Sequence, residues 1–450
     1  MKYYIQTFGC QMNVYDTNSL AGLLDQAGHE STDDLSQAEL ILLNTCAIRE
    51  GAEDRVRGRA GQLLKFKKRG KLKFLGLCGC MAQKEGERLL EAMPYLDLVM
   101  GPGAIGSIAR LVDDLTRGKG PLLELSGLED DYDQVFPTAH GGVSYPKFVS
   151  VMKGCDYKCT FCVVPNTRGP ERSRDPRLIL QEVENLVQQG HKEVTLIGQT
   201  INAYQWQDID FARLLAMVDA VPGLRRLRFT TSHPKNATPS MLDAMANLET
   251  VCEQLQLPVQ SGSNAVLRRM KRLYTREQYL DIIQQYKERF RGSDLPPAIT
   301  TDIIVGFPGE TEEDFEQTLD LVREVGYDQA FMFKYSPRRG TAATKLPGHL
   351  DEFTKSRRLD RLIQRQNEIA RERSETLVGK TAEVMVERAY QDSDGRQAYE
   401  ARLRTGRIVK LYEEQGPFSI GDLFDVEITG CHTYTLYAEP LNAPVNSHVA

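Results

Sequence analysis

The stretch that decides the fold is KGCDYKCTFC, from Lys153 to Cys162, which contains three cysteines at Cys155, Cys159 and Cys162. These cysteines follow KFVSVMK, a short apolar run with the β-branched content of a buried strand. Zinc usually takes four ligands, whereas a [4Fe–4S] cluster held by three thiolates leaves one iron open to another ligand. The spacing therefore indicates an iron–sulfur cluster after a strand, with a zinc knuckle as the alternative.

That strand is the first of six predicted strands separated by helical patterns, and the others are EVTLIG, RRLRFT, EQLQLPV, AITTDIIVG and DQAFMFKYS. Such a series predicts a partial (β/α)6 TIM-like barrel that is open on one side. We assign residues 146–377 to this domain, including a long charged helix from about 350 to 377. Barrels of this type perform their chemistry at the carboxyl ends of the strands, which is where the three cysteines lie.

Residues 1–125 show a separate run of strand and helix patterns, with strands KYYIQTF, AELILLN, KLKFLGL and LDLVMG. The helix DTNSLAGLLDQAG has Asp16 or Thr17 as its expected cap, and further helices are predicted from about Ile48 and from Gln83 to Ala92. Repeated strand–helix units of this kind predict a doubly wound α/β domain around a parallel sheet.

The remaining segments are predicted to be a linker and a small all-β domain. Residues 126–145 are acidic and then Pro- and Gly-containing, without periodicity, which is typical of a linker. Residues 378–443 contain short strand patterns separated by turn residues, which predicts a compact β-barrel. The chain is therefore expected to be a multidomain α/β protein.

The composition is that of a soluble protein, with 41% hydrophobic and 26% charged residues among 450. The start lacks the pattern of a signal peptide and no apolar run has membrane-spanning length, so we expect a cytoplasmic protein. Cysteines stay reduced in that compartment, which favours metal binding or catalysis over disulfides. The net charge of −6 weighs against bulk nucleic-acid binding but permits local basic patches.

A second group of cysteines follows three successive strands of the first domain. Cys10 follows the first strand and Cys46 the second, while Cys78 and Cys80 both follow the third. The carboxyl ends of parallel strands share one edge, so these thiols predict a second metal site there. The spacing does not choose between Cys78 and Cys80, and burial as ordinary core cysteines is the alternative. Cys252 and Cys431 have no such partners and are interpreted as structural.

The spacing C-x3-C-x2-C resembles that of the radical S-adenosylmethionine enzymes. The resemblance implies that the open iron binds the amino and carboxylate groups of S-adenosylmethionine, whose reductive cleavage gives a 5′-deoxyadenosyl radical. It also implies binding of this cofactor at the strand ends, by Phe161, Gly198, Gln199, Ser232, Gln260, Ser261, Ile304 and Gly306.

The chain more specifically resembles the methylthiotransferases, through QTFGCQMN, NTCAIRE, GCMAQ, GCDYKCTFCVVPNTRGPERSR, SHP, LPVQSGS and TDIIVGFPGET. The resemblance covers nearly the whole chain and implies an N-terminal auxiliary-cluster domain, a radical barrel and a C-terminal TRAM domain that binds nucleic acid. It selects Cys80 over Cys78, so that Cys10, Cys46 and Cys80 would hold a second [4Fe–4S] cluster.

Within this family, CVVPNTRGPERSR and TTSHP are most similar to the members that act on tRNA. The implied reaction adds a methylthio group to C2 of N6-isopentenyladenosine at position 37, in the anticodon stem-loop. The implied partners are an electron donor such as flavodoxin or ferredoxin and a sulfur source, and a monomer is expected. Methylthiolation of a ribosomal-protein aspartate is one alternative. A non-catalytic iron–sulfur carrier is another.

Basic side chains that could contact the substrate occur in three places, and the predicted residues are Arg168, Arg172, Arg174, Arg338, Arg404 and Arg407. A guanidinium group pairs equally well with phosphate and carboxylate. Ion pairing of the first three with Glu171 and Asp175 is therefore the alternative. Arg339 adjoins Arg338, and the sequence does not separate their roles.

Overall fold

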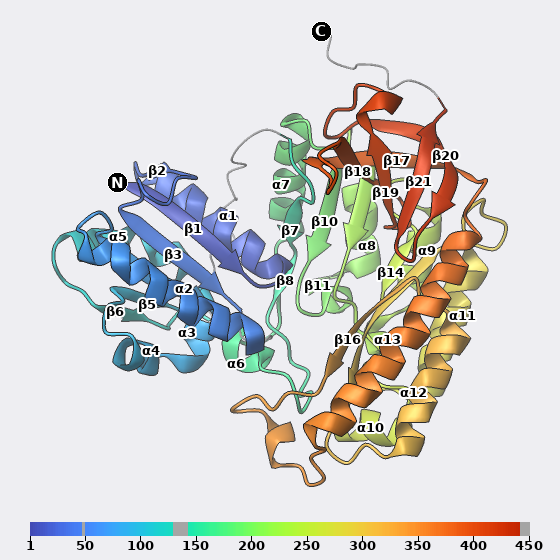
Figure 1. Cartoon of the computed structure of the whole chain (residues 1–450), viewed down its shortest axis with the longest axis horizontal. Helices are drawn as coiled ribbons and strands as arrows, with labels where there is room; N and C mark the ends of the chain where they lie inside the picture. The colour runs from blue at the N-terminus through green and yellow to red at the C-terminus, as the bar shows by residue number, and fades with distance from the viewer. Residues whose placement is uncertain (47–49, 129–142, 442–450) are drawn as a thin grey trace.

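The computed structural model describes residues 1–46, 50–128 and 143–441, and the chain forms three parts (Figure 1). An α/β layer structure at the N-terminus is followed by an open barrel and then by a small closed barrel. Most of the predicted linker, Ile48 and the last two residues of the predicted third domain lie outside the described residues. No helix in the described ranges has the length and apolar content needed to cross a membrane.

The N-terminal part contains a six-stranded sheet in which all neighbouring strands are parallel, in the order β2-β1-β3-β4-β5-β6. Its strands are β1 (Lys2–Phe8), β2 (Glu30–Ser31), β3 (Leu40–Thr45), β4 (Phe74–Gly79), β5 (Leu98–Met100) and β6 (Leu122–Glu124). Every residue of β3 is buried, because helices cover both faces of the sheet.

The helices of this part are α1 (Gln11–Gln26), α2 (Glu50–Lys68), α3 (Cys80–Glu85), α4 (Glu87–Ala92) and α5 (Ile108–Thr116), with a 3-10 turn η1 (Pro102–Ser107). Leu40 and Leu42 pack in one core with α1 and α5, whereas Ile41 and Leu43 pack in the other with α2, α3 and α4. This alternation confirms the doubly wound prediction. The single helix predicted from Gln83 is instead two helices that meet at Gly86.

The middle part contains the six predicted strands as two three-stranded parallel sheets, β7-β10-β13 and β14-β15-β16. The strands are β7 (Phe148–Ser150), β10 (Glu193–Ile197), β13 (Arg226–Phe229), β14 (Gln254–Gln256), β15 (Ala298–Val305) and β16 (Gln329–Lys334). A bridge between Leu227 and Val251 links the two sheets. Among the described residues no pairing joins β7 to β16, so the barrel is open as predicted.

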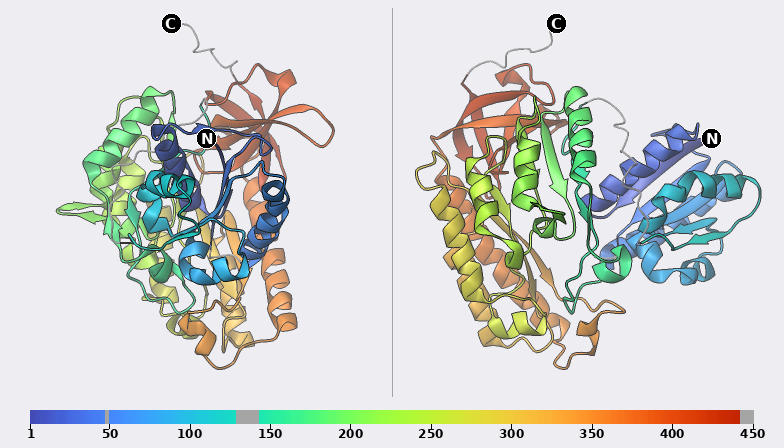
Figure 2. Two further views of the ribbon diagram at one scale, coloured as in Figure 1. Left: turned by 90° about the vertical axis from the view of Figure 1, so that its left-hand side faces the viewer. Right: turned by 180° about the vertical axis from the view of Figure 1, so that it is seen from behind.

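Helices line the outside of the barrel (Figure 2), and their apolar faces pack with the strands in one continuous core. They are α7 (Pro176–Gln188), α8 (Phe211–Asp219), α9 (Pro239–Asn247), α11 (Arg276–Arg289), α12 (Glu312–Val325) and α13 (Glu352–Glu375). Two short helices, α6 (Val164–Arg168) and α10 (Asn264–Arg269), lie at the carboxyl ends of the strands, as does a small hairpin of β8 (Met152–Lys153) and β9 (Arg172–Ser173).

The C-terminal part is a closed five-stranded barrel in the order β17-β18-β19-β21-β20, which confirms the all-β prediction. Its strands are β17 (Thr381–Gln391), β18 (Gln397–Leu403), β19 (Ile408–Tyr412), β20 (Leu423–Cys431) and β21 (Thr435–Pro440). Val384, Val409 and Val426 are among the fully buried residues of its core.

Ion pairs join this small barrel to the amino ends of the large barrel's strands, and the pair of Arg407 with Asp328 is buried. Arg226, the first residue of β13, donates to Glu383 of β17 at 2.8 Å. Arg404 pairs with Glu253 at 2.8 Å, and Arg407 pairs with Asp328 at 2.7 Å. These carboxylates precede β14 and β16, so the small barrel lies at the end of the large barrel that is opposite the three cysteines (Figure 1).

Arg404 and Arg407, which the sequence predicts as RNA contacts, have partners within the protein. Arg407 also donates to the Ser374 hydroxyl at 2.6 Å, and Arg404 donates to the backbone carbonyl of Val251 at 2.8 Å. The guanidinium group of Arg407 is buried and is costly to expose, whereas Arg404 is half-buried. The turn between β18 and β19 thus contributes two arginines to the contact between two parts of the protein, whereas Arg402 of β18 and Lys410 of β19 pair within the small barrel.

Arg226→Ala should destabilise the protein strongly. The Arg226 side chain is fully buried, and its removal deletes its hydrogen bonds to the Glu383 carboxylate and to the Arg402 carbonyl oxygen, both at 2.8 Å. The loss of hydrogen bonds made by a charged group costs about 1.5–3 kcal/mol each. Arg388→Ala is the matched control, because Arg388 is exposed and its pair with Glu400 contributes at most about 1 kcal/mol. Thermal unfolding midpoints compare the two variants, and equal midpoints would contradict the role assigned to Arg226.

Candidate active site

The three cysteines of the C-x3-C-x2-C motif lie in the loop between β8 and α6, and each thiol has a hydrogen-bonding neighbour. The Cys155 sulfur lies 3.3 Å from the Thr200 hydroxyl. Arg272 donates to the Cys159 sulfur at 3.4 Å, and the Val164 backbone N–H donates to the Cys162 sulfur at 3.4 Å. We call Cys155, Cys159 and Cys162 the barrel trio.

The path of this loop requires a glycine before the first cysteine. Gly154 has φ of +74°, and a side chain there would collide with the carbonyl oxygen of Pro170, 1.8 Å from the position of a Cβ atom. Gly154 donates its N–H to the Gln199 side-chain oxygen at 2.5 Å, which ties the loop to the end of β10. The sequence therefore fixes the cysteines against the strand ends.

The chemistry of these donors fits an iron–sulfur cluster. Burial raises the pKa of Cys155, and it raises the pKa of Cys162 to about 12, so a positively charged group is needed to hold the thiolate forms. N–H and O–H donors at the sulfurs stabilise the same forms. In the described part of the chain no three Cys, His, Asp or Glu side chains have the arrangement of ligands to one ion. A cubic cluster does not require that arrangement, because each thiolate binds a different iron.

Several predicted cofactor residues converge beside the barrel trio. Phe161 packs edge-on against Phe307, with ring centroids 6.3 Å apart, in an apolar group that includes Ile304. Gly306 has φ of +71° and donates its N–H to Glu310 at 2.6 Å. Gln260 has φ of +69° and bridges to Ile303 of β15. Gln260, Ile304 and Gly306 lie at the carboxyl ends of β14 and β15, and Phe161 of the cysteine loop packs beside them.

Buried polar atoms near the barrel trio lack partners within the described protein. The Ser232 hydroxyl and the Nε2 atom of His233 are both buried and have no hydrogen bond there. The His233 ring stacks on Tyr157 of the cysteine loop, with centroids 4.1 Å apart. Two unsatisfied polar atoms at this position fit a polar ligand such as S-adenosylmethionine.

Ser261 has a different environment from Ser232. Its hydroxyl lies 3.3 Å from the Thr318 hydroxyl of α12 and accepts the Ser263 N–H at 3.2 Å. The Gly198 carbonyl likewise accepts from the Thr231 hydroxyl at 2.7 Å. Both residues shape the strand ends through these internal bonds.

A second trio, Cys10, Cys46 and Cys80, lies at the carboxyl edge of the N-terminal sheet. Cys10 immediately precedes α1, Cys46 follows β3, and Cys80 begins α3. A hydrogen bond with Cys46 and the nearby charge of Arg168 lower the pKa of Cys10 to about 6. Cys10, rather than Asp16 or Thr17, caps α1. We call these three residues the sheet trio.

Cys78 is separate from the sheet trio. Its side chain belongs to the apolar core beneath α1 and α5, and its thiol lies 3.6 Å from the Leu43 carbonyl oxygen. Burial raises the pKa of Cys78 well above that of an ordinary thiol. In an uninterrupted strand Cys78 and Cys80 would share one face, so it is the turn at Gly79, with φ of +94°, that separates two cysteines that the spacing alone could not.

The two trios lie beside each other because α6 packs against α3 (Figure 1). Val163, which follows Cys162, packs on Cys80. Arg168, at the end of α6, donates from Nε to the Cys80 sulfur at 3.2 Å and pairs with buried Asp16 of α1 at 2.6 Å. A single short helix thus connects the barrel trio to the sheet trio.

Comparison with known proteins agrees with this arrangement. The chain matches the model of the Radical SAM superfamily over residues 149–322 and that of Uncharacterized protein family UPF0004 over residues 2–101. It is 41% identical to a tRNA-2-methylthio-N(6)-dimethylallyladenosine synthase of Thermoanaerobacter sp. (strain X514), covering 97% of this chain and 92% of the relative. The protein of that name from Symbiobacterium thermophilum is 42% identical, covering 99% and 95%.

The chain belongs to the tRNA-2-methylthio-N(6)-dimethylallyladenosine synthase family. Its radical SAM domain implies a [4Fe–4S] cluster and S-adenosylmethionine. Among solved structures, the methyltransferase TsrM from Kitasatospora setae has a TM-score of 0.56 at 14% identity, covering 74% of each chain. OxsB has a TM-score of 0.51 at 13% identity, covering 82% of this chain and 56% of its own. These two similarities concern the fold.

In this synthase-family chain, the arginines after the barrel trio face the protein interior. Arg174 pairs with Glu182 of α7 and donates to the Tyr15 hydroxyl of α1 at 3.3 Å. Arg172 donates to the Leu128 carbonyl oxygen. The alternative of ion pairing is therefore supported for Arg168 and Arg174, but with Asp16 and Glu182 in place of the expected neighbours.

The segment after β16 contains Arg338, a predicted substrate contact, and its neighbour Arg339. Arg339 is exposed and Arg338 is half-buried, and the Thr341 hydroxyl donates to the Arg338 carbonyl oxygen at 2.7 Å. The sequence pattern did not predict three neighbours of the barrel trio, which are Thr200, His233 and Arg272. Thr200 and His233 follow other strands, and Arg272 follows α10. The position of Thr200 directly after the expected Gln199 is the signal that could have found it.

Proposed function

We propose that this protein is a tRNA methylthiotransferase that adds a methylthio group to C2 of N6-isopentenyladenosine at position 37. The observation that carries the proposal is the contact of the two trios through α6, since sulfur insertion needs the radical and the sulfur at one carbon. Support also comes from the similarity, over nearly the full chain, to relatives named as synthases of the corresponding nucleoside.

In this proposal the barrel trio holds the cluster that binds S-adenosylmethionine. When bound, that cluster supplies the electron for reductive cleavage to a 5′-deoxyadenosyl radical. Gln199 holds the cysteine loop at the end of β10, and Phe161 and Ile304 offer an apolar surface to the adenine. Ser232 and His233 offer the polar atoms that lack partners within the described protein.

The sheet trio would hold the second [4Fe–4S] cluster, which supplies the sulfur of the methylthio group. Its thiols are buried or half-buried beneath α3 and α6, which keeps water from a reactive centre. Arg338 and Arg339 at the end of the sixth strand are the remaining candidates for contact with RNA phosphates. We place the protein in the cytoplasm as a monomer that uses an electron carrier such as flavodoxin or ferredoxin and a separate sulfur source.

The direct test is nucleoside analysis of tRNA. A strain that lacks the gene should contain N6-isopentenyladenosine without its methylthio group, and the cloned chain should restore that group. Loss of methylthio-aspartate from a ribosomal protein, with tRNA unchanged, would favour methylthiolation of a ribosomal-protein aspartate instead. Release of an intact cluster without any 5′-deoxyadenosine formed under reduction would favour the iron–sulfur carrier.

Arg168→Gln should lower the reduction potential of the second cluster while leaving the first unchanged. Arg168 is a positioning residue whose positive charge lies beside Cys80 and thereby favours the reduced, more negative cluster. Redox titration followed by electron paramagnetic resonance measures both potentials. Arg168→Lys should restore part of the lost reduction potential, because lysine keeps the positive charge but not the forked geometry of the guanidinium group.

Arg177→Gln is the matched control for Arg168→Gln, since Arg177 is 84% exposed and pairs with Asp175 at the surface. Unchanged potential and unchanged iron content in Arg168→Gln would remove Arg168 from this role. An equally lowered potential of the second cluster in Arg177→Gln would show that the measurement reports general damage to the protein.

A further inference from the structure

A hollow of about 470 Å³ lies at the surface beside the barrel trio, and the proposed function does not use it. Three of its lining residues come from the cysteine loop and four follow or end α10, and they are Asp156, Tyr157, Lys158, Arg268, Lys271, Arg272 and Leu273. Four of these seven side chains are cationic and one is acidic. We call this hollow the cationic pocket.

The cationic pocket is in direct contact with the loop that would hold the first cluster. Lys158 is the residue before Cys159, and Arg272 donates to the Cys159 sulfur at 3.4 Å and to the Pro258 carbonyl oxygen at 3.3 Å. One wall of the pocket is therefore the outer side of the cysteine loop. A partner seated in the pocket would lie next to the barrel trio.

The remaining surface combines charge with an exposed apolar side chain. Lys158, Arg268 and Lys271 are exposed, and Leu273 is 55% exposed between them. Protein interfaces commonly have an apolar centre and a polar rim, and opposite charge on the partner raises the rate of encounter. This surface fits an acidic protein better than an uncharged ligand.

The pocket does not lie on the path that the proposed substrate must take. The adenine must reach both trios, whereas no described residue of the N-terminal part lines the pocket. The sheet trio instead meets the barrel through α6, which also contributes no residue to the pocket. A partner in this pocket approaches only the barrel trio.

We infer that the cationic pocket is the docking surface for a small acidic protein that carries single electrons at low potential. The inference rests on the proposed radical chemistry. The carrier would give up one electron and be oxidised by one electron, and the cluster held by the barrel trio would supply that electron to the sulfonium of S-adenosylmethionine. The S–C5′ bond then breaks to give methionine and the 5′-deoxyadenosyl radical. The pocket places the carrier where this electron must enter.

The test compares two reductants on a variant with reversed charge, Arg268→Glu/Lys271→Glu, in the cluster-loaded full chain. The thiols of the barrel trio are contacted by Thr200, Arg272 and Val164 rather than by these two side chains, so cleavage driven by dithionite should be unchanged. Cleavage driven by low concentrations of reduced flavodoxin should fall about tenfold or more at low salt, because the acidic carrier is repelled. The readout is 5′-deoxyadenosine, which does not depend on the identity of the methylthio acceptor.

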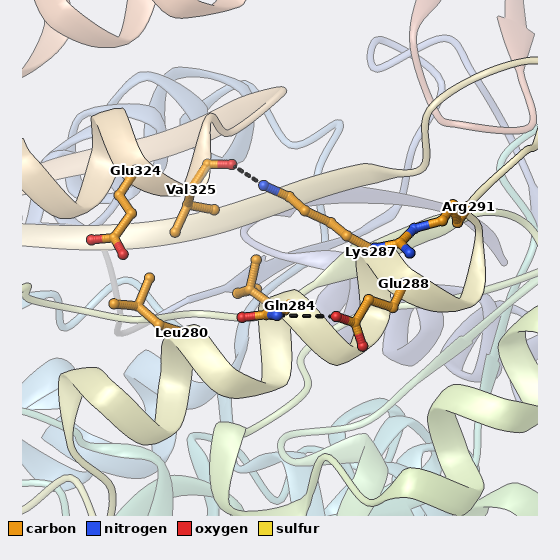
Figure 3. Close-up of a pocket in the computed structure, with 8 residues that line it drawn as sticks. Leu280, Gln284, Lys287, Glu288, Arg291, Glu324 and Val325 are labelled. Atoms are coloured by element: carbon orange, nitrogen blue, oxygen red, sulfur yellow. Dashed lines mark hydrogen bonds between the residues drawn. The ribbon is translucent and has the colours of Figure 1, made fainter.

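The matched control is Arg225→Glu/Arg291→Glu, which changes the charge equally on exposed residues outside the pocket. Arg291 borders a separate groove of about 410 Å³ between α11 and α12, whose lining residues are drawn in Figure 3. This control variant should cleave S-adenosylmethionine at the wild-type rate with dithionite and with reduced flavodoxin.

Equal flavodoxin-driven rates in the pocket variant and the wild type would overturn the inference. A lower rate of 5′-deoxyadenosine formation with both reductants would also overturn it. A loss of tRNA affinity in the pocket variant would assign the pocket to RNA. If the tRNA assay fails while the reductant-specific loss is found, the docking surface stands and the proposed acceptor falls.

Discussion

Cys159→Ala should reduce the formation of 5′-deoxyadenosine to the level of a protein-free control. The Cys159 sulfur is the member of the barrel trio that receives the Arg272 guanidinium, and no fourth cysteine lies in the loop to replace it. Two thiolates hold a cubic cluster poorly, so the iron that binds S-adenosylmethionine is lost. The measurement is 5′-deoxyadenosine after anaerobic reduction with dithionite.

Iron analysis separates the loss of one cluster from general damage. Reconstituted wild-type protein should contain about eight iron atoms and Cys159→Ala about four, since the sheet trio is intact. Cys252→Ala is the matched control, because Cys252 is buried in the barrel before the start of β14, with its thiol 4.0 Å from the Thr250 carbonyl oxygen. Continued 5′-deoxyadenosine formation by Cys159→Ala would sink the assignment of the first cluster.

The fold could be predicted from the sequence because each strand has a strong local pattern. The run LILLNT of β3 is buried on both faces, as a parallel strand requires, and the cysteines follow such strands directly. Parallel strands share a carboxyl edge, so the meeting of Cys10 and Cys46 follows from the topology alone. The closed small barrel followed in the same way from short strands and turn residues.

The roles of the arginines could not be predicted, because their partners are distant in the sequence. Arg168 pairs with Asp16 and Arg407 with Asp328, and neither carboxylate lies near its arginine along the chain. A basic sequence pattern is the same whether the side chain faces phosphate or a buried carboxylate. Only the packing of α6 on α3, and of the small barrel on the strand starts, decides between them.

The choice between Cys78 and Cys80 is a case where resemblance and geometry agree for different reasons. The motif GCMAQ selects Cys80 by similarity. The structure places Cys78 within the core under α1, whereas Cys80 begins α3 at the edge of the sheet. A turn in which Gly79 has φ of +94° separates the two side chains, a conformation that other residues rarely adopt.

Cys46→Ala should stop methylthio transfer while leaving some cleavage of S-adenosylmethionine. Cys46 is 2% exposed and contacts Cys10 across the sheet edge, so its loss breaks the sheet trio. The barrel trio lies in a separate loop and keeps its own donors from Thr200, Arg272 and Val164. Mass spectrometry of tRNA nucleosides, together with 5′-deoxyadenosine analysis, measures the two steps separately.

Cys78→Ala is the control for Cys46→Ala, because it removes a buried thiol from the neighbouring strand but not from the sheet trio. It should retain the methylthio product and about eight iron atoms, with only the small loss of stability expected from a minor cavity. Full methylthio product from Cys46→Ala would exclude the sheet trio as the source of the second cluster. Loss of the methylthio product from Cys78→Ala at normal iron content would instead show that the edge of the sheet tolerates no change in β4. Cys10→Ala would then replace Cys46→Ala as the test of the sheet trio.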